Sequence, residues 1–344
     1  MPVLNRKVAA AALASALITC ATLGSGQLAS AATATTKAKA KTVSRGIVAA
    51  KGRPPSQAAP FLWDRPSPDP TTYPPAASFE EATTKVVPNN KLFTLLVIGS
   101  DARPKEKIDR SRADSIHLFV WNPAWNQGII VGFPRDAYVA IPGKGTGKIN
   151  SALTLGGPAL LMATVNGITK KPTLEVERYA IAGFTGFAAM VDEIGGVNVL
   201  VDPSMNDATS GARFGKGWHA MNGKAALAFS RNRKTVAGGD FGRSLNQGRV
   251  MLYGLAKLRE EVSDASGLVR WIQSFRKNGS TNVPVGDLLV FSQIVRSIDP
   301  VNVQNFVLTG KTKRVSGTDV VVLDTAPLVG FMEDISRDAV NNGR

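Results

Sequence analysis

Apolar runs rich in β-branched residues alternate with longer amphipathic stretches from residue 91 to the C-terminus. Residues 92–98 form a continuous apolar run that ends at Gly99, which predicts a strand buried on both faces. Residues 115–121 and 128–133 repeat the pattern on either side of turn-forming Asn and Gly residues, so they predict a hairpin. Further strands are predicted at residues 175–181, 197–201 and 319–323.

The stretches between these strands predict helices over residues 158–168, 184–194, 243–261, 267–276 and 285–298. The first helical stretch extends back to Ser151, but Gly156, Gly157 and Pro158 interrupt it, so the helix is predicted from Pro158 onward, with proline in its first turn, where it is tolerated. About thirty residues before position 243 lack apolar periodicity and predict a loop. Strands that alternate with helices predict an α/β or α+β fold. We expect a single three-layer sandwich domain with a central mixed sheet flanked by helices.

The first 90 residues lack this pattern. Residues 1–31 combine two early bases, an apolar stretch over 8–23 and the small-residue site Ala29-Ser30-Ala31, which predicts a signal peptide or a membrane anchor. The apolar stretch is shorter than the roughly 20 residues that span a bilayer. Residues 32–90 are basic and proline-rich, which predicts a disordered tether. The folded domain is therefore expected over residues 91–344.

Composition adds an argument from charge. The chain has 41 Lys and Arg against 26 Asp and Glu, a formal net charge of +15, which is typical of proteins with anionic partners. The first 60 residues hold eight of these bases and no acid, so about half of the excess lies outside the domain. This distribution and the export signal argue against nucleic acid as the partner. One cysteine, Cys20, and two histidines exclude an internal disulfide and a His-rich metal site.

The bases of the domain gather in loops that follow the apolar runs. They are Arg103, Arg110, Arg112, Arg135, Lys148, Arg231, Arg233 and Arg243, with Gln247 one turn after the last. Loops at strand ends meet at one edge of an α/β sheet, where ligand sites usually lie. Clustered arginines repel one another unless an anion offsets their charge, and guanidinium groups match phosphate oxygens. The pattern therefore predicts a site for a diphosphate or polyphosphate.

Two carboxylates, Asp101 and Asp114, lie at the edges of adjacent predicted strands near these bases. One interpretation is a magnesium–pyrophosphate site, because Mg²⁺ is held by one or two carboxylates together with substrate phosphates. The other is structural, because an Asp among arginines also pairs with one of them or caps a helix. His117 lies inside an apolar strand and His219 follows Trp218, so packing is favoured over catalysis for both histidines.

Six short motifs follow one another along this domain. They are Gly99-Ser100-Asp101-Ala102-Arg103, Arg112-Ala113-Asp114-Ser115, Phe133-Pro134-Arg135-Asp136, Lys148-Ile149-Asn150, Arg231-Asn232-Arg233 and Gly239-Asp240-Phe241-Gly242-Arg243. Together they resemble the LytR-CpsA-Psr (LCP) family of cell-wall glycopolymer phosphotransferases, with a motif-bearing core at residues 91–260. The resemblance implies transfer of a glycopolymer from a polyprenyl-pyrophosphate carrier to peptidoglycan, with formation of a phosphodiester. It also implies a location at the outer face of the bacterial cytoplasmic membrane, either secreted or anchored at the membrane surface.

The resemblance implies a role for each matching residue. Asp101 and Asp114 correspond to Mg²⁺ ligands. The pyrophosphate-binding set is Arg103, Arg112, Arg135, Lys148, Arg231, Arg233, Arg243 and Gln247. The catalytic set is Arg135, Asp136, Asp240 and Arg243, in which Asp240 or Asp136 orients an arginine or accepts the proton of the acceptor hydroxyl.

The resemblance further implies that the sandwich encloses an apolar pocket for the polyprenyl tail. The lining candidates are Leu160, Leu161, Val165, Phe184, Phe187, Met190, Leu252 and Leu255, for each of which ordinary core packing is the alternative. The chain departs from the family at Asn246, where an arginine often precedes the Gln. A non-catalytic protein that binds polyprenyl phosphate or wall polymer is therefore kept as an alternative, and the same site could also hydrolyse a pyrophosphate.

Overall fold

The computed structural model describes residues 61–63, 92–103, 105–261 and 265–342. These residues belong to one compact unit, Ile47–Arg344. The predicted signal or anchor segment, residues 1–31, lies outside the described residues, as does most of the predicted tether.

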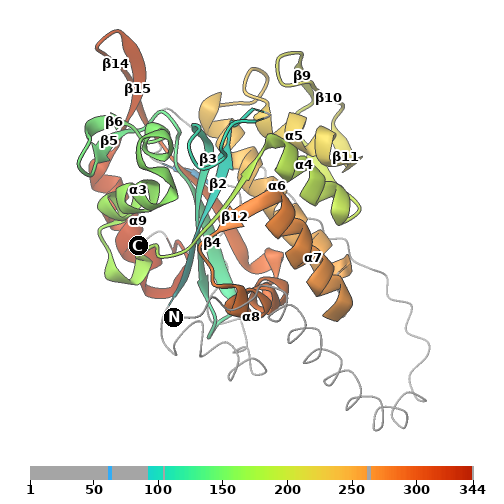
Figure 1. The fold of residues 1–344 in the computed structure, drawn as a ribbon. Helices are drawn as coiled ribbons and strands as arrows, with labels where there is room; N and C mark the ends of the chain where they lie inside the picture. Colours follow the sequence, from blue (N-terminus) through green and yellow to red (C-terminus); the bar gives the residue numbers. More distant parts are fainter. Residues whose placement is uncertain (1–60, 64–91, 104, 262–264, 343–344) are drawn as a thin grey trace, which may run out of the picture. The chain divides into compact units, whose positions relative to one another are not determined.

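A seven-stranded sheet forms the centre of this unit, in the order β1-β13-β4-β3-β2-β7-β12 (Figure 1). The strands are β1 (Phe61–Trp63), β2 (Phe93–Ser100), β3 (Ala113–Asn122), β4 (Gln127–Gly132), β7 (Tyr179–Gly183), β12 (Gly279–Thr281) and β13 (Val303–Leu308). β2, β3 and β4 form an antiparallel meander, whereas β13 pairs with β4, and β7 with β2, in parallel. The predicted hairpin and the predicted mixed sheet are confirmed.

Helices cover both faces of the sheet, which confirms the three-layer sandwich (Figure 1). α3 (Ser151–Thr169) and α9 (Thr325–Asp338) pack on one face, and α6 (Asp240–Glu261) and α8 (Val285–Ser297) pack on the other. α4 (Phe184–Glu193), α5 (Gly223–Arg231) and α7 (Ala265–Asn278) contact one another or α6 outside the second face. Two short 3₁₀ helices are η2 (Pro172–Leu174) and η3 (Pro300–Asn302).

The two faces follow the alternation of side chains along β2. Leu96 and Ile98 belong to the core under α3 and α9, whereas Phe93 and Leu95 belong to the core under α6 and α8. Both faces are apolar because both are covered, as the continuous apolar run predicted.

α3 begins at Ser151, earlier than the predicted start at Pro158. Gly157, with φ of 73°, interrupts the helical backbone, and Pro158 starts the second segment. By length and composition α3 could span a bilayer. In the structure it is a core helix, because Leu153, Leu161 and Val165 are fully buried against the sheet.

Three parts of the chain differ from the predictions. Phe61–Trp63, inside the predicted tether of residues 32–90, form edge strand β1 of the sheet, paired antiparallel with β13. The predicted loop before residue 243 contains short strands and helix α5, whose cap Asn222 accepts a hydrogen bond from the backbone of Ala225. α9 follows the strand that we expected to be the last element.

The remaining strands form two-stranded hairpins at the periphery. They are β5 (Tyr138–Ile141) with β6 (Gly145–Lys148), β8 (Val197–Val201) with β11 (Gly217–Met221), β9 (Met205–Asp207) with β10 (Ala212–Phe214), and β14 (Gly310–Val315) with β15 (Thr318–Leu323). The predicted strands at 197–201 and 319–323 correspond to β8 and β15. The strand predicted at 175–181 begins four residues later, at Tyr179, and the residues between η2 and Tyr179 belong to no helix or strand.

Candidate functional site

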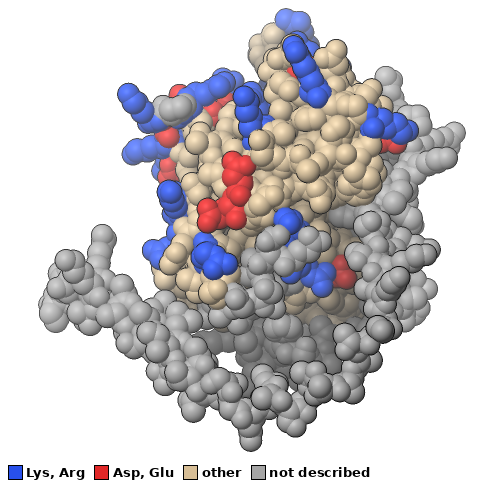
Figure 2. Space-filling view, turned by 90° about the vertical axis from the view of Figure 1, so that its right-hand side faces the viewer, with Lys and Arg blue, Asp and Glu red and all other residues tan. Residues whose placement is uncertain are grey.

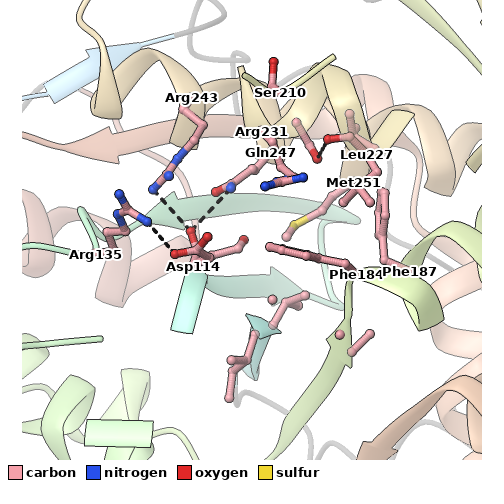
Figure 3. Close-up of a pocket in the computed structure, with 18 of the residues that line it drawn as sticks. Asp114, Arg135, Phe184, Phe187, Ser210, Leu227, Arg231, Arg243, Gln247 and Met251 are labelled. Atoms are coloured by element: carbon pink, nitrogen blue, oxygen red, sulfur yellow. Dashed lines mark hydrogen bonds and ion pairs between the residues drawn. The ribbon is translucent and has the colours of Figure 1, made fainter. Parts of the chain in front are cut away.

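Asp114 and Arg135 lie at the same edge of the sheet, because β3 begins where β4 ends. The pairing of β2 with β3 is irregular here. Gly99 pairs with Ser115 and the next residue of β2 pairs with Ala113, so Asp114 has no partner on β2. A bulge of this kind re-aims a side chain. The carboxylate of Asp114 accepts a hydrogen bond from Nη1 of Arg135 at 2.5 Å (Figure 3).

The first turns of α6 bring three more of the predicted residues to this edge. Asp240 is its first residue, and Arg243 and Gln247 follow on the same helix face. Nη2 of Arg243 lies 2.9 Å from Oδ1 of Asp240 and 3.4 Å from the backbone oxygen of Asp114. Nε2 of Gln247 donates to the same backbone oxygen at 3.4 Å. These contacts join the start of α6 to the bulge in β3 (Figure 3).

Arg135 lies among three carboxylates. Its Nε is 3.6 Å from Oδ1 of Asp240 and 3.9 Å from Oδ2 of Asp136, in addition to the contact with Asp114. Asp136 in turn lies 2.9 Å from Nζ of Lys148. Burial acts to lower the pKa of Arg135, but the carboxylates, Asp114 foremost, outweigh it and raise this pKa. Arg135 is therefore a permanent positive charge that holds the carboxylates together.

Arg243 is the most buried base of the site, with 6% of its surface exposed. Burial lowers its pKa, while Asp240 acts against this and the charge of Arg135 adds to it. Nε of Arg135, Nε of Arg243 and Oδ2 of Asp240 are buried without a hydrogen-bond partner, whereas Oδ1 of Asp240 has its ion pairs with the two arginines. Buried polar atoms without partners are costly. These atoms of the cluster are therefore available for hydrogen bonds or coordination to a charged ligand.

A cavity of about 340 Å³ opens beside this cluster, at the small end of the range of ligand pockets. Its charged wall contains Asp114, Arg135, Arg231, Arg233, Lys234, Arg243 and Gln247. Its apolar wall contains Val97, Ala180, Ile181, Phe184, Phe187, Met190, Leu227, Val250, Met251 and Phe275. Cζ of Arg231 lies 4.5 Å from the ring centroid of Phe184, a cation–π contact between the two walls (Figure 3). A ligand with a diphosphate head and a hydrocarbon tail matches this combination.

Six of the predicted site residues therefore line one cavity, and the other six do not. Asp101, Arg103 and Arg112 line a second, more open groove. The carboxylate of Asp101 accepts a hydrogen bond from the backbone nitrogen of Arg112 at 2.8 Å. The bulge gives Asp114 a different direction, so the structure places the two expected Mg²⁺ ligands in different cavities. Asp136, Lys148 and Asp240 border the first cavity through their ion pairs without lining it.

Three of the candidates for an apolar lining belong to the cavity, and all three lie on one helix. Phe184, Phe187 and Met190 on α4 line the cavity. The other candidates are ordinary core. Leu160, Leu161 and Val165 pack between α3 and the opposite face of the sheet, and Leu252 and Leu255 pack between α6 and α8.

The β9–β10 turn contributes residues that the sequence did not indicate. Asp207, Thr209 and Ser210 line the cavity beside Arg233 and Lys234. Burial acts to raise the pKa of Asp207, but hydrogen bonds, first from the backbone of Thr209, lower it. Nζ of Lys234 donates to Oγ1 of Thr209 at 2.7 Å. These residues belong to no recognised motif, and they line the cavity only because the fold brings the β9–β10 turn next to it.

His117 is buried next to the site and does not line the cavity. His117 is fully buried, and its ring nitrogens lie 3.0 Å from Oγ of Ser115 and 3.0 Å from the backbone oxygen of Ser244. This confirms a packing role for His117.

Oδ1 of Asn246 accepts a hydrogen bond from Nη1 of Arg249 at 2.9 Å, and Asn246 does not line the cavity. The departure at position 246 therefore concerns a buried residue that does not line the cavity.

Three comparisons with known proteins agree with this geometry. The family model described as the LytR_cpsA_psr family matches residues 71–335. The polyisoprenyl-teichoic acid–peptidoglycan teichoic acid transferase TagU of Bacillus anthracis is 35% identical over 198 residues, which are 57% of this chain and 62% of that protein. This chain therefore spans less than two thirds of the length of that relative.

Solved structures show the same fold. B. subtilis TagV has a TM-score of 0.61 and 26% identity, over 72% of this chain and 97% of that one. TagT bound to LI-WTA has a TM-score of 0.60 and 25% identity, over 73% of this chain and 91% of that one. Since the family model covers well over half of the sequence and the folds agree, the chain belongs to the LytR-CpsA-Psr family.

Proposed function

We propose that the protein transfers a glycopolymer from a polyprenyl-pyrophosphate carrier to peptidoglycan. The observation that carries this proposal is a single cavity with arginines on one wall and apolar side chains on the other, joined by the contact of Arg231 with Phe184. A lipid pyrophosphate has these two chemical parts in this order. TagU relatives are named as transferases of a polyisoprenyl-linked polymer to peptidoglycan, which supports the same substrate class.

In the proposed step, a hydroxyl oxygen of the acceptor attacks the phosphorus next to the glycopolymer. A phosphorus–oxygen bond to the acceptor forms, the bond from that phosphorus to the bridging oxygen breaks, and polyprenyl phosphate leaves. The hydroxyl proton passes to a carboxylate of the Arg135 cluster, for which Asp240 and Asp136 are the candidates. The arginines offset the negative charge on the phosphoryl oxygens and on the leaving phosphate.

We also propose that Asp114 and Asp240 hold a Mg²⁺ ion, in place of the pair Asp101 and Asp114. Oδ2 of Asp240 is buried without a hydrogen-bond partner, and both carboxylates lie against the same Arg135. Their chemistry fits a hard cation, which takes carboxylate oxygens together with substrate phosphates. Bound Mg²⁺ would supply positive charge to the pyrophosphate oxygens. No group of three or more His, Cys, Asp and Glu in the described residues could hold a metal, so the other ligands would be phosphates and water.

The proposed substrates place the reaction outside the cytoplasmic membrane. The signal-like or anchor-like residues 1–31 and the basic stretch after them support a location at the outer membrane surface, close to the cell wall. Basic side chains also form separate groups on the folded unit, most densely at one edge of the face seen in Figure 2.

The test uses the purified full chain, a polyprenyl-pyrophosphate-linked saccharide, a peptidoglycan fragment and Mg²⁺. We expect release of polyprenyl phosphate together with a phosphodiester-linked product, both measured by mass spectrometry. Arg135→Ala and Arg233→Ala should abolish turnover, because each removes a cation from the charged wall. Arg314→Ala is the matched control, since Arg314 is exposed on β14, away from the residues that line the cavity.

Three outcomes would contradict the proposal in different ways. Unchanged turnover in both arginine variants would refute the assigned site. Release of polyprenyl phosphate without a linked product would indicate a pyrophosphatase. Binding of the lipid without turnover in the presence of acceptor and Mg²⁺ would favour the non-catalytic binding protein.

A further inference from the structure

The β14–β15 hairpin projects from the folded unit beside β5 and β6 (Figure 1). β14 begins at Gly310, two residues after β13 ends at Leu308, and β13 ends beside the end of β4. The hairpin therefore starts from the edge of the sheet that also holds Arg135. All four residues from Lys311 to Arg314 are exposed, and the proposed reaction uses none of them.

The two faces of the hairpin carry different side chains. Residues that pair directly across the two strands lie on one face, so Lys311 shares a face with Val322, and Lys313 shares it with Val320. Val322 is 40% exposed, whereas Val320 is buried. We call Lys311, Lys313 and Val322 the lysine face.

The positive charge of the lysine face is not balanced within the protein. Asp319 is the single acid in the sequence of residues 310–323, and it pairs across the strands with Arg314, on the opposite face. Within the parts of the chain that the structure describes, neither Lys311 nor Lys313 forms an ion pair with a carboxylate. The lysine face therefore presents two positive charges beside an exposed aliphatic side chain.

Backbone contacts fix the base of the hairpin to the candidate site. The backbone nitrogen of Val321 donates to the backbone oxygen of Asp136 at 2.9 Å, and Val321 forms a parallel bridge with Ala137. Asp136 directly follows Arg135, which lies among the carboxylates of the cluster. A surface that binds the lysine face is therefore held at a defined position relative to the cavity.

The N-terminal part of the chain joins the folded unit at the same edge. Phe61, the first residue of β1, pairs with Leu308 at the end of β13, and the hairpin begins two residues after Leu308. The sequence before Phe61 holds eight bases, no acid and the apolar stretch at 8–23. Bases near an apolar segment are typical of attachment to an anionic membrane surface. The predicted attachment therefore starts from the edge at which the hairpin lies.

We propose that the lysine face binds the phosphate-bearing headgroups of anionic phospholipids and so orients the cavity toward the membrane that holds the lipid carrier. The proposal rests on the proposed function, because that function places the protein at the outer membrane surface. Lysine side chains beside an exposed valine suit a membrane interface, where the aliphatic stems lie against apolar groups and the ammonium groups reach the phosphates.

A wall polymer is the alternative anionic partner of the lysine face. Residues 310–323 include no aromatic side chain for stacking on sugar rings. The entry of the chain at Phe61 also relates the hairpin to the membrane-directed segment and not to the wall. These two observations favour the membrane.

The test measures binding of the purified full chain to vesicles by cosedimentation. One set of vesicles contains equal parts of phosphatidylglycerol and phosphatidylcholine, and the other contains phosphatidylcholine alone. Lys313→Gln and Arg314→Gln are the matched pair, because each removes one charge from adjacent exposed positions on opposite faces of the hairpin. The bases before Phe61 are the same in every variant, so a difference between variants reports on the hairpin.

We expect Lys313→Gln to weaken binding to the anionic vesicles about fivefold, and the double variant Lys311→Gln with Lys313→Gln to weaken it about twentyfold, with a smaller dependence on salt. Arg314→Gln should bind as the parent does, and the uncharged vesicles should not distinguish the variants. Equal weakening by Lys313→Gln and Arg314→Gln would show an effect of net charge alone and overturn the proposal. Unchanged vesicle binding by the double variant, with weaker binding to a soluble oligo(glycerol phosphate), would assign the lysine face to a wall polymer and overturn it as well.

Turnover separates this proposal from the proposed function. With a donor dispersed in uncharged detergent, the double variant should match the parent, because no anionic surface is present. With the same donor in anionic vesicles, its apparent KM should rise about twentyfold at unchanged kcat, following the loss of vesicle binding. An equal loss with the dispersed donor would show that the hairpin acts through its contact with Asp136 and would overturn the proposal. Absence of turnover by the parent with either donor would refute the proposed function, while the vesicle experiment still decides the lysine face.

Discussion

Acidification from pH 7 to pH 4 should lower the free energy of unfolding by about 3 kcal/mol through the single side chain of His117. Burial lowers the pKa of this histidine from 6.5 to about 4, and the charge of Arg243 acts in the same direction, while the hydrogen bond to Ser244 opposes them. The difference between the two pKa values, multiplied by about 1.4 kcal/mol per unit, gives a full loss of about 3.5 kcal/mol, of which about 3 kcal/mol is lost by pH 4, where half of the folded protein is protonated.

The sign follows from which state binds the proton. Between pH 6.5 and pH 4 the histidine is protonated in the unfolded chain and neutral in the folded protein. Stability is therefore complete above pH 6.5 and is lost as the pH falls toward 4. Asp207 acts in a lower range, because its carboxyl has a lowered pKa in the folded protein and an ordinary value of 3.8.

The hydrogen bonds of His117 give the structural reason. The backbone oxygen of Ser244 can only accept, so Nε2 carries the proton and Nδ1 accepts from the hydroxyl of Ser115. A second proton would remove that acceptor and place a charge in the core beside Arg243. Ser115 lines the cavity, and Ser244 is adjacent to Arg243 on α6. Protonation should therefore loosen the site together with the core.

Urea unfolding at a series of pH values measures this effect. His117→Gln should be less sensitive to pH than the parent protein between pH 4 and 6.5, because its amide does not titrate. His219→Gln is the control, since His219 lies outside the core and its Nε2 donates a hydrogen bond to the backbone oxygen of Gly215 at 2.8 Å. Parallel pH profiles for the parent and His117→Gln would refute the reasoning.

Three further substitutions test the site and the fold. Asp240→Asn should lower kcat by about a hundredfold in the polyprenyl phosphate release assay, because it removes a catalytic charge from the cluster, and near-normal turnover would contradict this. Phe184→Ala should weaken lipid pyrophosphate binding about fivefold by removing the ring under Arg231, and an unchanged Kd in calorimetry would show that the contact is incidental. Gly248→Ala should cost about 1–3 kcal/mol in thermal unfolding, because its Cβ would lie 2.0 Å from Oδ1 of buried Asn305, and an unchanged Tm would contradict this packing.

The sequence predicted the sheet where apolar runs are continuous, and missed it where polar residues are buried. All six residues of β13 are buried, although Gln304 and Asn305 interrupt its apolar pattern. Gln304 accepts a hydrogen bond from the backbone of Asn341, and Asn305 donates one to the backbone of Leu245. These partners come from distant parts of the chain. The local pattern therefore did not predict this strand.

At the candidate site too, the local sequence could not predict features that depend on distant parts of the chain. Motifs at strand ends predicted that bases converge, because neighbouring antiparallel strands end and begin at one edge. They could not show that Asp114 stands on a bulge and turns away from the groove of Asp101. They also could not distinguish Leu161, under α3, from Phe187, in the cavity, since both are simply apolar positions on predicted helices.

The charges of the cavity separate two groups of arginines. Arg135 and Arg243 lie against carboxylates, and their charge is largely balanced within the cluster. Arg231 and Arg233 line the same cavity, and in the described parts of the chain neither forms an ion pair with a carboxylate. We expect the unbalanced pair to offer its charge to the proposed pyrophosphate, because no ion pair with a carboxylate must break first. Arg135 instead fixes the carboxylates at the reacting centre, so the two groups should contribute differently to substrate binding and to the chemical step.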